Sequence, residues 1–160
     1  MWILTLAACV SRPPPNTADP ADQSQALAGP VIALERTACF GGCPVYRIAV
    51  SREGVVTYEG SANVSRVGTA TAQISEDRLH ALLNELEQAG YFTFAARYAV
   101  SEPTCRRYTT DSPTTISSAT FKGRTKRIEH DYGCGGVPGA LTVMEKRIDE
   151  VLGSGRWTGR

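Results

Sequence analysis

Four segments in the first half of the chain predict β-strands: a short apolar run at 31–34, a segment with strand periodicity at 45–50, its expected hairpin partner at 55–59, and a further strand at 63–74. In the second of these, Tyr46, Ile48 and Val50 fall on one face, because successive side chains of a strand point to opposite sides. The residues at 52–54 form a turn, so the second and third segments are expected to pair as a hairpin.

After residue 74 the apolar residues recur with the period of a helix. Ser75 followed by Glu76 and Asp77 predicts a helix start, since serine caps free N–H groups and acidic side chains suit the positive end of the helix dipole. The buried stripe of this helix is Leu79, Leu82, Leu83 and Leu86, and Gly90 ends it. A second helix from about 139 to Gly153 has its own stripe: Leu141, Met144, Ile148, Val151 and Leu152.

Two more strands are expected between the helices, at 114–121 and 124–130, joined by a turn at 122–123. Residues 97–113 are expected to form an excursion outside the sheet. The order ββββαββα with hairpin connections predicts the α+β class: an antiparallel sheet of about six strands with two helices packed on one face.

The length of 160 residues suits one domain and a tail. The formal net charge of +1 gives no electrostatic reason to expect nucleic acid as a partner. No run of about 18 apolar residues predicts a membrane-spanning helix. We expect a monomer with no cofactor and no metal.

The first nine residues predict how the protein is processed and where it is located. Leu6-Ala7-Ala8-Cys9 resembles the bacterial lipobox, in which the Cys thiol receives a lipid and the chain is cut just before it. The alternative is an ordinary chain start with one unmodified cysteine. The expected organisation is a truncated lipoprotein signal peptide at 1–8, a lipidated Cys9 with a flexible Pro- and Ala-rich tether at 9–29, and a single α+β domain at 30–157.

The expected location follows from this organisation. The protein would be lipid-anchored in the bacterial cell envelope, and Val10 after the lipidated Cys favours the outer membrane, with the domain facing the periplasm.

The four remaining cysteines are an even number, which favours disulfide bonds outside the cytoplasm. We favour Cys39–Cys43 with Cys105–Cys134, because Gly41 and Gly42 let the short loop fold back sharply. A redox site prefers a two-residue spacer, and a zinc site needs two close ligand pairs, but both stay open as alternatives.

Several motifs together resemble one protein family. They are Glu35-Arg36, Cys43-Pro44-Val45-Tyr46 and Gly54-Val55-Val56-Thr57-Tyr58-Glu59-Gly60, then Thr110-Asp111-Ser112-Pro113-Thr114-Thr115, Gly123 and Ile128-Glu129-His130-Asp131-Tyr132-Gly133. The chain from about Val31 to Trp157 is similar to the domain-of-unknown-function family DUF6438 of bacterial envelope proteins. The resemblance implies membership and location, and it implies no activity.

Candidate catalytic residues are few. His130 ends a predicted strand, and Asp111 approaches the neighbouring strand, so a His–Asp pair could activate a hydroxyl of Ser112, Thr114 or Thr115. The alternative is that Asp111 opens a turn and His130 packs at the strand end. The Gly-x-Ser-x-Gly turn that would present a serine nucleophile does not occur in the sequence.

Two features suggest a contact surface. The loop of Phe40, Gly41 and Gly42 could hold an aromatic ring outward, although packing of Phe40 in the core is the alternative. The segment 122–127 has four cations, which could meet phosphate groups or simply form a solvated or protective sheet edge.

Two function classes follow. The first is a lipid-anchored, non-catalytic binding module for an envelope protein, glycan or lipid. The second is a small envelope hydrolase or transferase that uses His130 and Asp111.

Overall fold

The computed structural model describes residues 29–159. The signal, lipidation and tether predictions, including Cys9, lie outside these described residues. Within them, none of the helices has the length and apolar character needed to cross a membrane.

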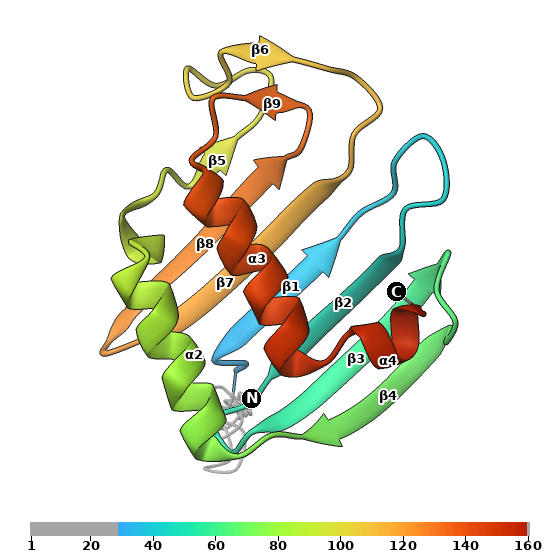
Figure 1. The fold of residues 1–160 in the computed structure, drawn as a ribbon, viewed down its shortest axis with the longest axis vertical. Coiled ribbons are helices and arrows are strands. Elements are labelled where there is room, and N and C mark those ends of the chain that lie inside the picture. Colours follow the sequence, from blue (N-terminus) through green and yellow to red (C-terminus); the bar gives the residue numbers. More distant parts are fainter. Residues whose placement is uncertain (1–28, 160) are drawn as a thin grey trace, which may run out of the picture.

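The domain is a sheet covered on one face by helices (Figure 1). Seven strands pair in the order β4-β3-β2-β1-β7-β8-β5. Their bounds are β1 Ile32–Arg36, β2 Val45–Val50, β3 Val55–Ala62, β4 Gly68–Gln73, β5 Arg97–Tyr98, β7 Thr114–Phe121 and β8 Arg124–Asp131. The helices are α2 Glu76–Gln88, α3 Gly139–Leu152 and the short α4 Gly155–Thr158, with a 3-10 turn at Tyr91–Thr93.

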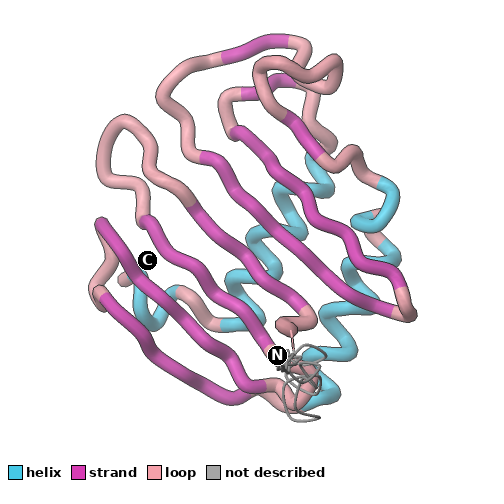
Figure 2. Tube along the Cα trace, turned by 180° about the vertical axis from the view of Figure 1, so that it is seen from behind, coloured by secondary structure: helices cyan, strands magenta, loops and turns pink. Residues whose placement is uncertain are grey.

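This architecture confirms the α+β class with a large antiparallel sheet and two main helices. Both α2 and α3 lie on the same face, and the view from behind shows the other face without helices (Figure 2). Ser75 caps α2 by accepting a hydrogen bond from the Arg78 N–H, as its position in the sequence predicts. The strands at the start and middle of the chain also lie where the alternation places them.

Two expectations about strands are wrong in detail. The segment 63–74 is not one strand: Asn63 and Gly68 both have φ in the left-handed region, so the chain reverses between β3 and β4. The excursion at 97–113 contributes β5, which pairs in parallel with β8, and β6 Arg107–Tyr108, which pairs with β9 Cys134–Gly135 in a separate small sheet. Helix α4 was not expected, and its Trp157 stacks on Tyr58 with 4.8 Å between ring centroids.

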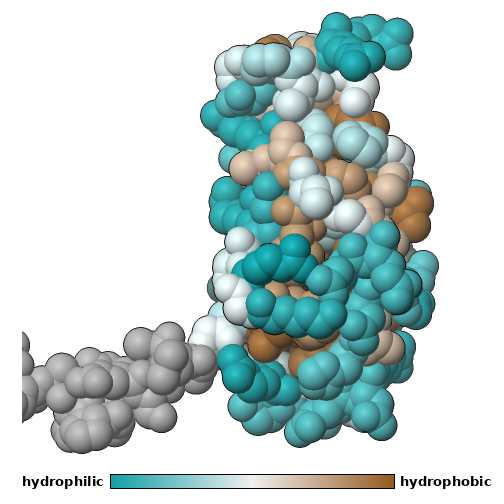
Figure 3. All heavy atoms as spheres, turned by 90° about the vertical axis from the view of Figure 1, so that its left-hand side faces the viewer, coloured by the Kyte–Doolittle hydropathy of each residue, from teal (hydrophilic) through white to brown (hydrophobic). Residues whose placement is uncertain are grey.

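The core lies between the sheet and the two helices. Its sheet side is the row of helix-facing positions such as Ile32, Leu34 and Ile48, all fully buried. The four leucines predicted for α2 are buried there, as are Leu141, Ile148, Val151 and Leu152 of α3. Seen from the side that carries α2, hydrophilic side chains cover much of the surface and leave patches of the apolar layer visible between them (Figure 3).

The four cysteines pair as the sequence favours. Cys39 and Cys43 are bonded with Cα atoms 5.6 Å apart, and Cys105 and Cys134 with Cα atoms 5.0 Å apart. In the chain-entropy model the longer loop contributes about 3.7 kcal/mol and the shorter about 2 kcal/mol. The long link therefore matters more for stability, and it ties the 97–113 excursion to β9.

Candidate functional site

At one end of the sheet, the helix-facing row changes from apolar to polar. Pairing places Arg36 of β1 beside Tyr46 of β2 and Thr115 of β7, and Thr115 beside His130 of β8. These side chains therefore share one row across neighbouring strands, on the face covered by α3. Tyr132 lies just beyond the end of the same strand, two residues after His130.

Helix α3 places two carboxylates above this row. Glu145 and Asp149 are four residues apart, so they lie on the same side of the helix, one turn from each other. Glu145 is fully buried, and the side chain of Asp149 is 17% exposed. Carboxylates in such positions need partners, because burial without hydrogen bonds or a counter-charge is costly.

Arg36 and Tyr46 are the partners of Asp149. The Arg36 guanidinium donates to Asp149 Oδ2 from Nε at 2.8 Å and from Nη2 at 2.7 Å. The Tyr46 hydroxyl donates to Asp149 Oδ1 at 2.6 Å. Burial, and next the charge of Asp149, raises the pKa of Tyr46, so this phenol keeps its proton at neutral pH and remains a donor.

His130 and Tyr132 are the partners of Glu145. His130 Nδ1 lies 3.0 Å from each oxygen of Glu145, and the Tyr132 hydroxyl donates to Oε2 at 2.8 Å. The two rings stack with centroids 4.3 Å apart. Burial and then the charge of Glu145 raise the pKa of Tyr132, which keeps that hydroxyl protonated as well.

Arg36 joins the two halves. Its Nη1 donates to Thr115 Oγ1 at 3.0 Å and to the Tyr132 hydroxyl at 3.5 Å. We call the set Arg36, Tyr46, His130, Tyr132, Glu145 and Asp149 the polar network. Across residues 29–159, no buried side-chain nitrogen or oxygen is left without a hydrogen-bond partner. The buried polar atoms of the network are therefore all hydrogen-bonded, and the network holds α3 at a fixed place on the sheet.

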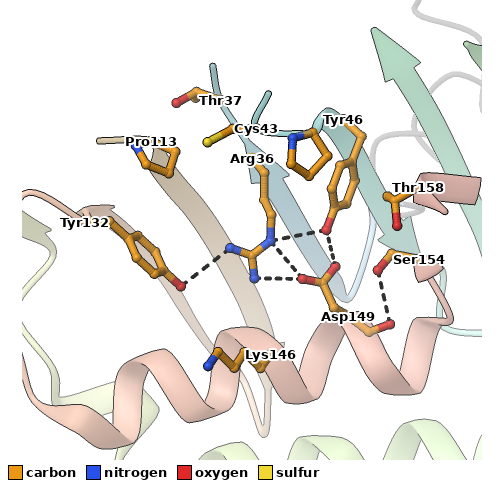
Figure 4. Close-up of a pocket in the computed structure, with 11 residues that line it drawn as sticks. Arg36, Thr37, Cys43, Tyr46, Pro113, Tyr132, Lys146, Asp149, Ser154 and Thr158 are labelled. Carbon is orange, nitrogen blue, oxygen red and sulfur yellow. Dashed lines mark hydrogen bonds and ion pairs between the residues drawn. The ribbon is translucent and has the colours of Figure 1, made fainter. Parts of the chain in front are cut away.

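A pocket of about 440 Å³ opens over the Arg36–Asp149 end of the network (Figure 4). Besides network side chains, it is lined by Thr37, Cys43, Pro44, Pro113, Lys146, Ser154 and Thr158. Two prolines and two tyrosine rings give it apolar walls. Lys146 is exposed at its edge and forms no ion pair with the described residues. The shape fits a bound side chain or small apolar group, with one cation available to an acidic neighbour.

The loop between β1 and β2 forms the rim of this pocket and is held at several points. The Phe40 N–H donates to the Asp111 carbonyl at 3.1 Å, and the Thr37 N–H donates to the Thr114 carbonyl at 3.0 Å. The Asn63 side-chain amide donates to the Cys43 carbonyl at 3.1 Å. With the disulfide, these contacts fix the backbone of the loop.

Phe40 itself points into solvent, with 88% of the residue exposed. The alternative that it packs in the core is wrong, because the short disulfide loop reverses the chain beyond the end of the sheet. Gly41 has φ of 126°, a conformation that a residue with a side chain rarely adopts. A rigid loop that exposes an aromatic ring is a low-entropy contact element.

The structure does not bring His130 and Asp111 together as a pair. His130 is 3% exposed and faces Glu145, whereas Asp111 lies in an exposed turn with φ of 68° and accepts a hydrogen bond from Thr110. Asp111 instead supports the Phe40 loop through its backbone carbonyl. This outcome matches the expectation of a turn residue and a packed histidine.

The cationic segment has partners on α2. Lys122 donates to Glu87 at 2.6 Å, and Arg124 also pairs with Glu87. Both cations are exposed: Lys122 lies in the turn before β8, and Arg124 is the first residue of β8, away from the two residues that pair with β5. In the part of the chain that the structure describes, no three His, Cys, Asp or Glu side chains come together as a metal site.

Sequence reasoning missed most of the network, although signals for it exist. Arg36 continues the helix-facing alternation of Ile32 and Leu34. Glu145 lies four residues after Leu141 and three before Ile148, so it falls in the buried stripe of its own helix. A charged residue in an apolar stripe signals a buried partner.

The fold and the site define a small α+β domain with a closed polar network, a shallow pocket and a disulfide loop beside it. The family model described as Domain of unknown function (DUF6438) matches residues 30–152. The chain belongs to this family. No curated protein matches the chain.

Replacing Glu145 by Leu should lower the free energy of unfolding by about 3 kcal/mol, because His130 and Tyr132 would each lose a buried acceptor. Urea unfolding followed by tryptophan fluorescence measures it. Glu150→Leu, on the exposed side of the same helix, is the control and should change stability by less than about 0.5 kcal/mol. Equal effects of the two substitutions would contradict a structural role for the buried carboxylate.

Proposed function

We propose that this protein is a lipid-anchored envelope domain that binds a protein partner and has no catalytic turnover of its own. The observation that carries the binding role is the exposed Phe40 on a loop held by a disulfide and backbone hydrogen bonds. An aromatic ring presented in a fixed conformation loses little entropy on binding, and aromatic residues dominate the energetics of protein interfaces.

The pocket adds a second contact to this surface. Its walls include Pro44 and Pro113, and the loop that carries Phe40 forms its rim. A side chain of the partner would enter the pocket while Phe40 packs on the surface around it. Lys146 at the edge favours a partner with an acidic residue next to the inserted group.

The arrangement of the polar network supports binding over catalysis. Its carboxylates and His130 Nδ1 are occupied by each other, by Arg36 and by two tyrosines. A general base needs a free acceptor within reach of a substrate proton. His130 is buried under α3 and has Glu145 as its partner, so its role is to hold the helix.

The anchor rests on sequence. Leu6-Ala7-Ala8-Cys9 followed by a Pro- and Ala-rich segment is the pattern of a lipidated cysteine with a tether. Extended at about 3.1 Å per residue, such a tether would let the domain search up to about 60 Å from the membrane. Tethering near a membrane raises the effective concentration of the domain for other envelope proteins.

Cys9 should be acylated when the gene is expressed from its own locus. Metabolic labelling with a palmitate analogue and fractionation of membranes measure this directly. The protein should be labelled and membrane-bound, and Cys9→Ala should lose both properties. A Cys9→Ala protein that labels and fractionates like the wild type would contradict the anchor.

Removing the Phe40 ring should reduce partner recovery at least tenfold. The measurement is crosslinking in intact envelopes followed by affinity capture, with wild type and Phe40→Ala compared at equal thermal stability. Val55→Ala, which shortens an exposed apolar residue at the far end of β3, is the matched control and should recover partners normally. Unchanged recovery with Phe40→Ala would remove this loop from the interface.

A further inference from the structure

Strand β4 is a free edge of the sheet with an unusual lack of protection. Among residues 29–159 it pairs only with β3, and its sequence Gly68-Thr69-Ala70-Thr71-Ala72-Gln73 contains no charged residue and no proline. Sheet edges in single-chain proteins usually carry charges, prolines or bulges, which prevent pairing with other chains. The opposite side of this sheet has that protection, because Arg124, Lys126 and Arg127 follow one another along β8.

The backbone groups on this edge point outward. The Val55 carbonyl accepts a hydrogen bond from the Ser51 N–H, so the backbone groups of Val55 face β2. Because the direction of the backbone N–H and C=O groups alternates along a strand, those of Val56 and Tyr58 face β4. The backbone N–H and C=O groups of their partners, Ala72 and Ala70, therefore point toward β3 and form hydrogen bonds with it. The N–H and C=O groups of Thr69, Thr71 and Gln73 therefore face away from the sheet.

We propose that β4 pairs with β4 of a second copy of this chain, antiparallel and with Thr71 opposite Thr71. This register also sets Thr69 opposite Gln73 on both sides of the two-fold axis, so all the outward-facing residues exchange backbone hydrogen bonds. Side chains of opposite residues share a face, and the sheet continues through both copies with the helices on one side. Ala70 and Ala72 place small side chains on the helix-facing side of the extended sheet. On the opposite side, Thr71 would lie beside Thr71 of the second copy, and such Thr–Thr pairs are favourable across neighbouring strands.

Charge at the ends of the strand favours a second copy over an unrelated peptide. Arg66 precedes β4, and Glu76 and Asp77 follow it at the start of α2. In the antiparallel pair, the N-terminal end of one β4 lies beside the C-terminal end of the other. Arg66 of each copy is thereby brought toward Glu76 and Asp77 of the other copy.

Existing contacts leave the edge accessible. Arg66 donates to the Thr69 carbonyl from Nε at 3.2 Å and Nη2 at 3.1 Å, and this oxygen has a second lone pair for an N–H of the other copy. The Gln73 side chain turns toward the Glu53 carbonyl, at 2.7 Å, and so does not cover the edge. Pairing here is independent of the Phe40 surface, and it predicts a dimer where the sequence alone predicts a monomer.

Charge substitution at the two-fold axis tests the register. The full chain with Cys9→Ser, which carries no lipid, should sediment as a dimer that dissociates on dilution. Thr71→Lys alone and Thr71→Glu alone should each weaken dimerisation at least tenfold, because like charges would face each other. An equimolar mixture of the two should restore the dimer.

The same two substitutions at Thr125, whose N–H faces the free side of the cationic β8 edge, are the matched control and should leave dimerisation unchanged. As a second measurement, Thr71→Cys should crosslink two chains on mild oxidation, and Thr69→Cys should not, because Thr69 lies opposite Gln73. A wild type that stays a single chain at the highest soluble concentration, or a mixture that fails to restore the dimer, would overturn the proposal. Equal crosslinking at both positions would do the same.

Discussion

The position of α3 on the sheet depends on the hydrogen bonds that its two sheet-facing carboxylates, Glu145 and Asp149, form with the strands below. Glu145 and Asp149 occupy the face of the helix that covers the sheet, where an unpartnered carboxylate would cost several kcal/mol. Arg36, Tyr46, His130 and Tyr132 supply the partners, each from a fixed place at the ends of β1, β2 and β8. Apolar packing alone would let the helix slide, whereas this set of hydrogen bonds is satisfied at one register only.

The same contacts position the surface that we propose for binding. Arg36 is the last residue of β1, and the Cys39–Cys43 loop begins just after it. The pocket lies between this loop, the end of β2 and the side of α3. Because Asp149 holds Arg36 from the helix side, the network fixes one wall of the pocket, while the disulfide and the backbone hydrogen bonds of the loop hold its rim. The polar side chains of the site thus hold the structure rigid, and a rigid site suits recognition.

Much of the fold follows from local patterns in the sequence. The alternation at 45–50, the period change after residue 74 and the glycine after Leu152 place β2, α2 and α3 correctly, because burial on one face decides each of them. The reversal at 63–67 was missed because the β-branched Val64 and Val67 favour a strand, whereas Asn63 tolerates the left-handed φ that the turn requires. The parallel pairing of β5 depends on contacts distant in sequence, which no local pattern contains.

Local sequence patterns predict less of the candidate site. The cysteine pairs follow from spacing and glycines, but the exposure of Phe40 does not, because an aromatic residue is as readily expected in the core. The pairing of His130 with Glu145 does not, because it depends on which turn of α3 lies over β8. The family match defines membership for residues 30–152 and leaves the activity to be established by experiment.

A double-mutant cycle between Arg36 and Asp149 tests the central claim most directly. The free energy of unfolding is measured for the wild type, Arg36→Met, Asp149→Leu and the double variant. Since the two side chains share two hydrogen bonds and lie 113 residues apart in the sequence, we expect a coupling energy of about 2 kcal/mol, with the double variant less destabilised than the sum of the single variants. A coupling below about 0.5 kcal/mol would mean that apolar packing places α3, and it would contradict the account.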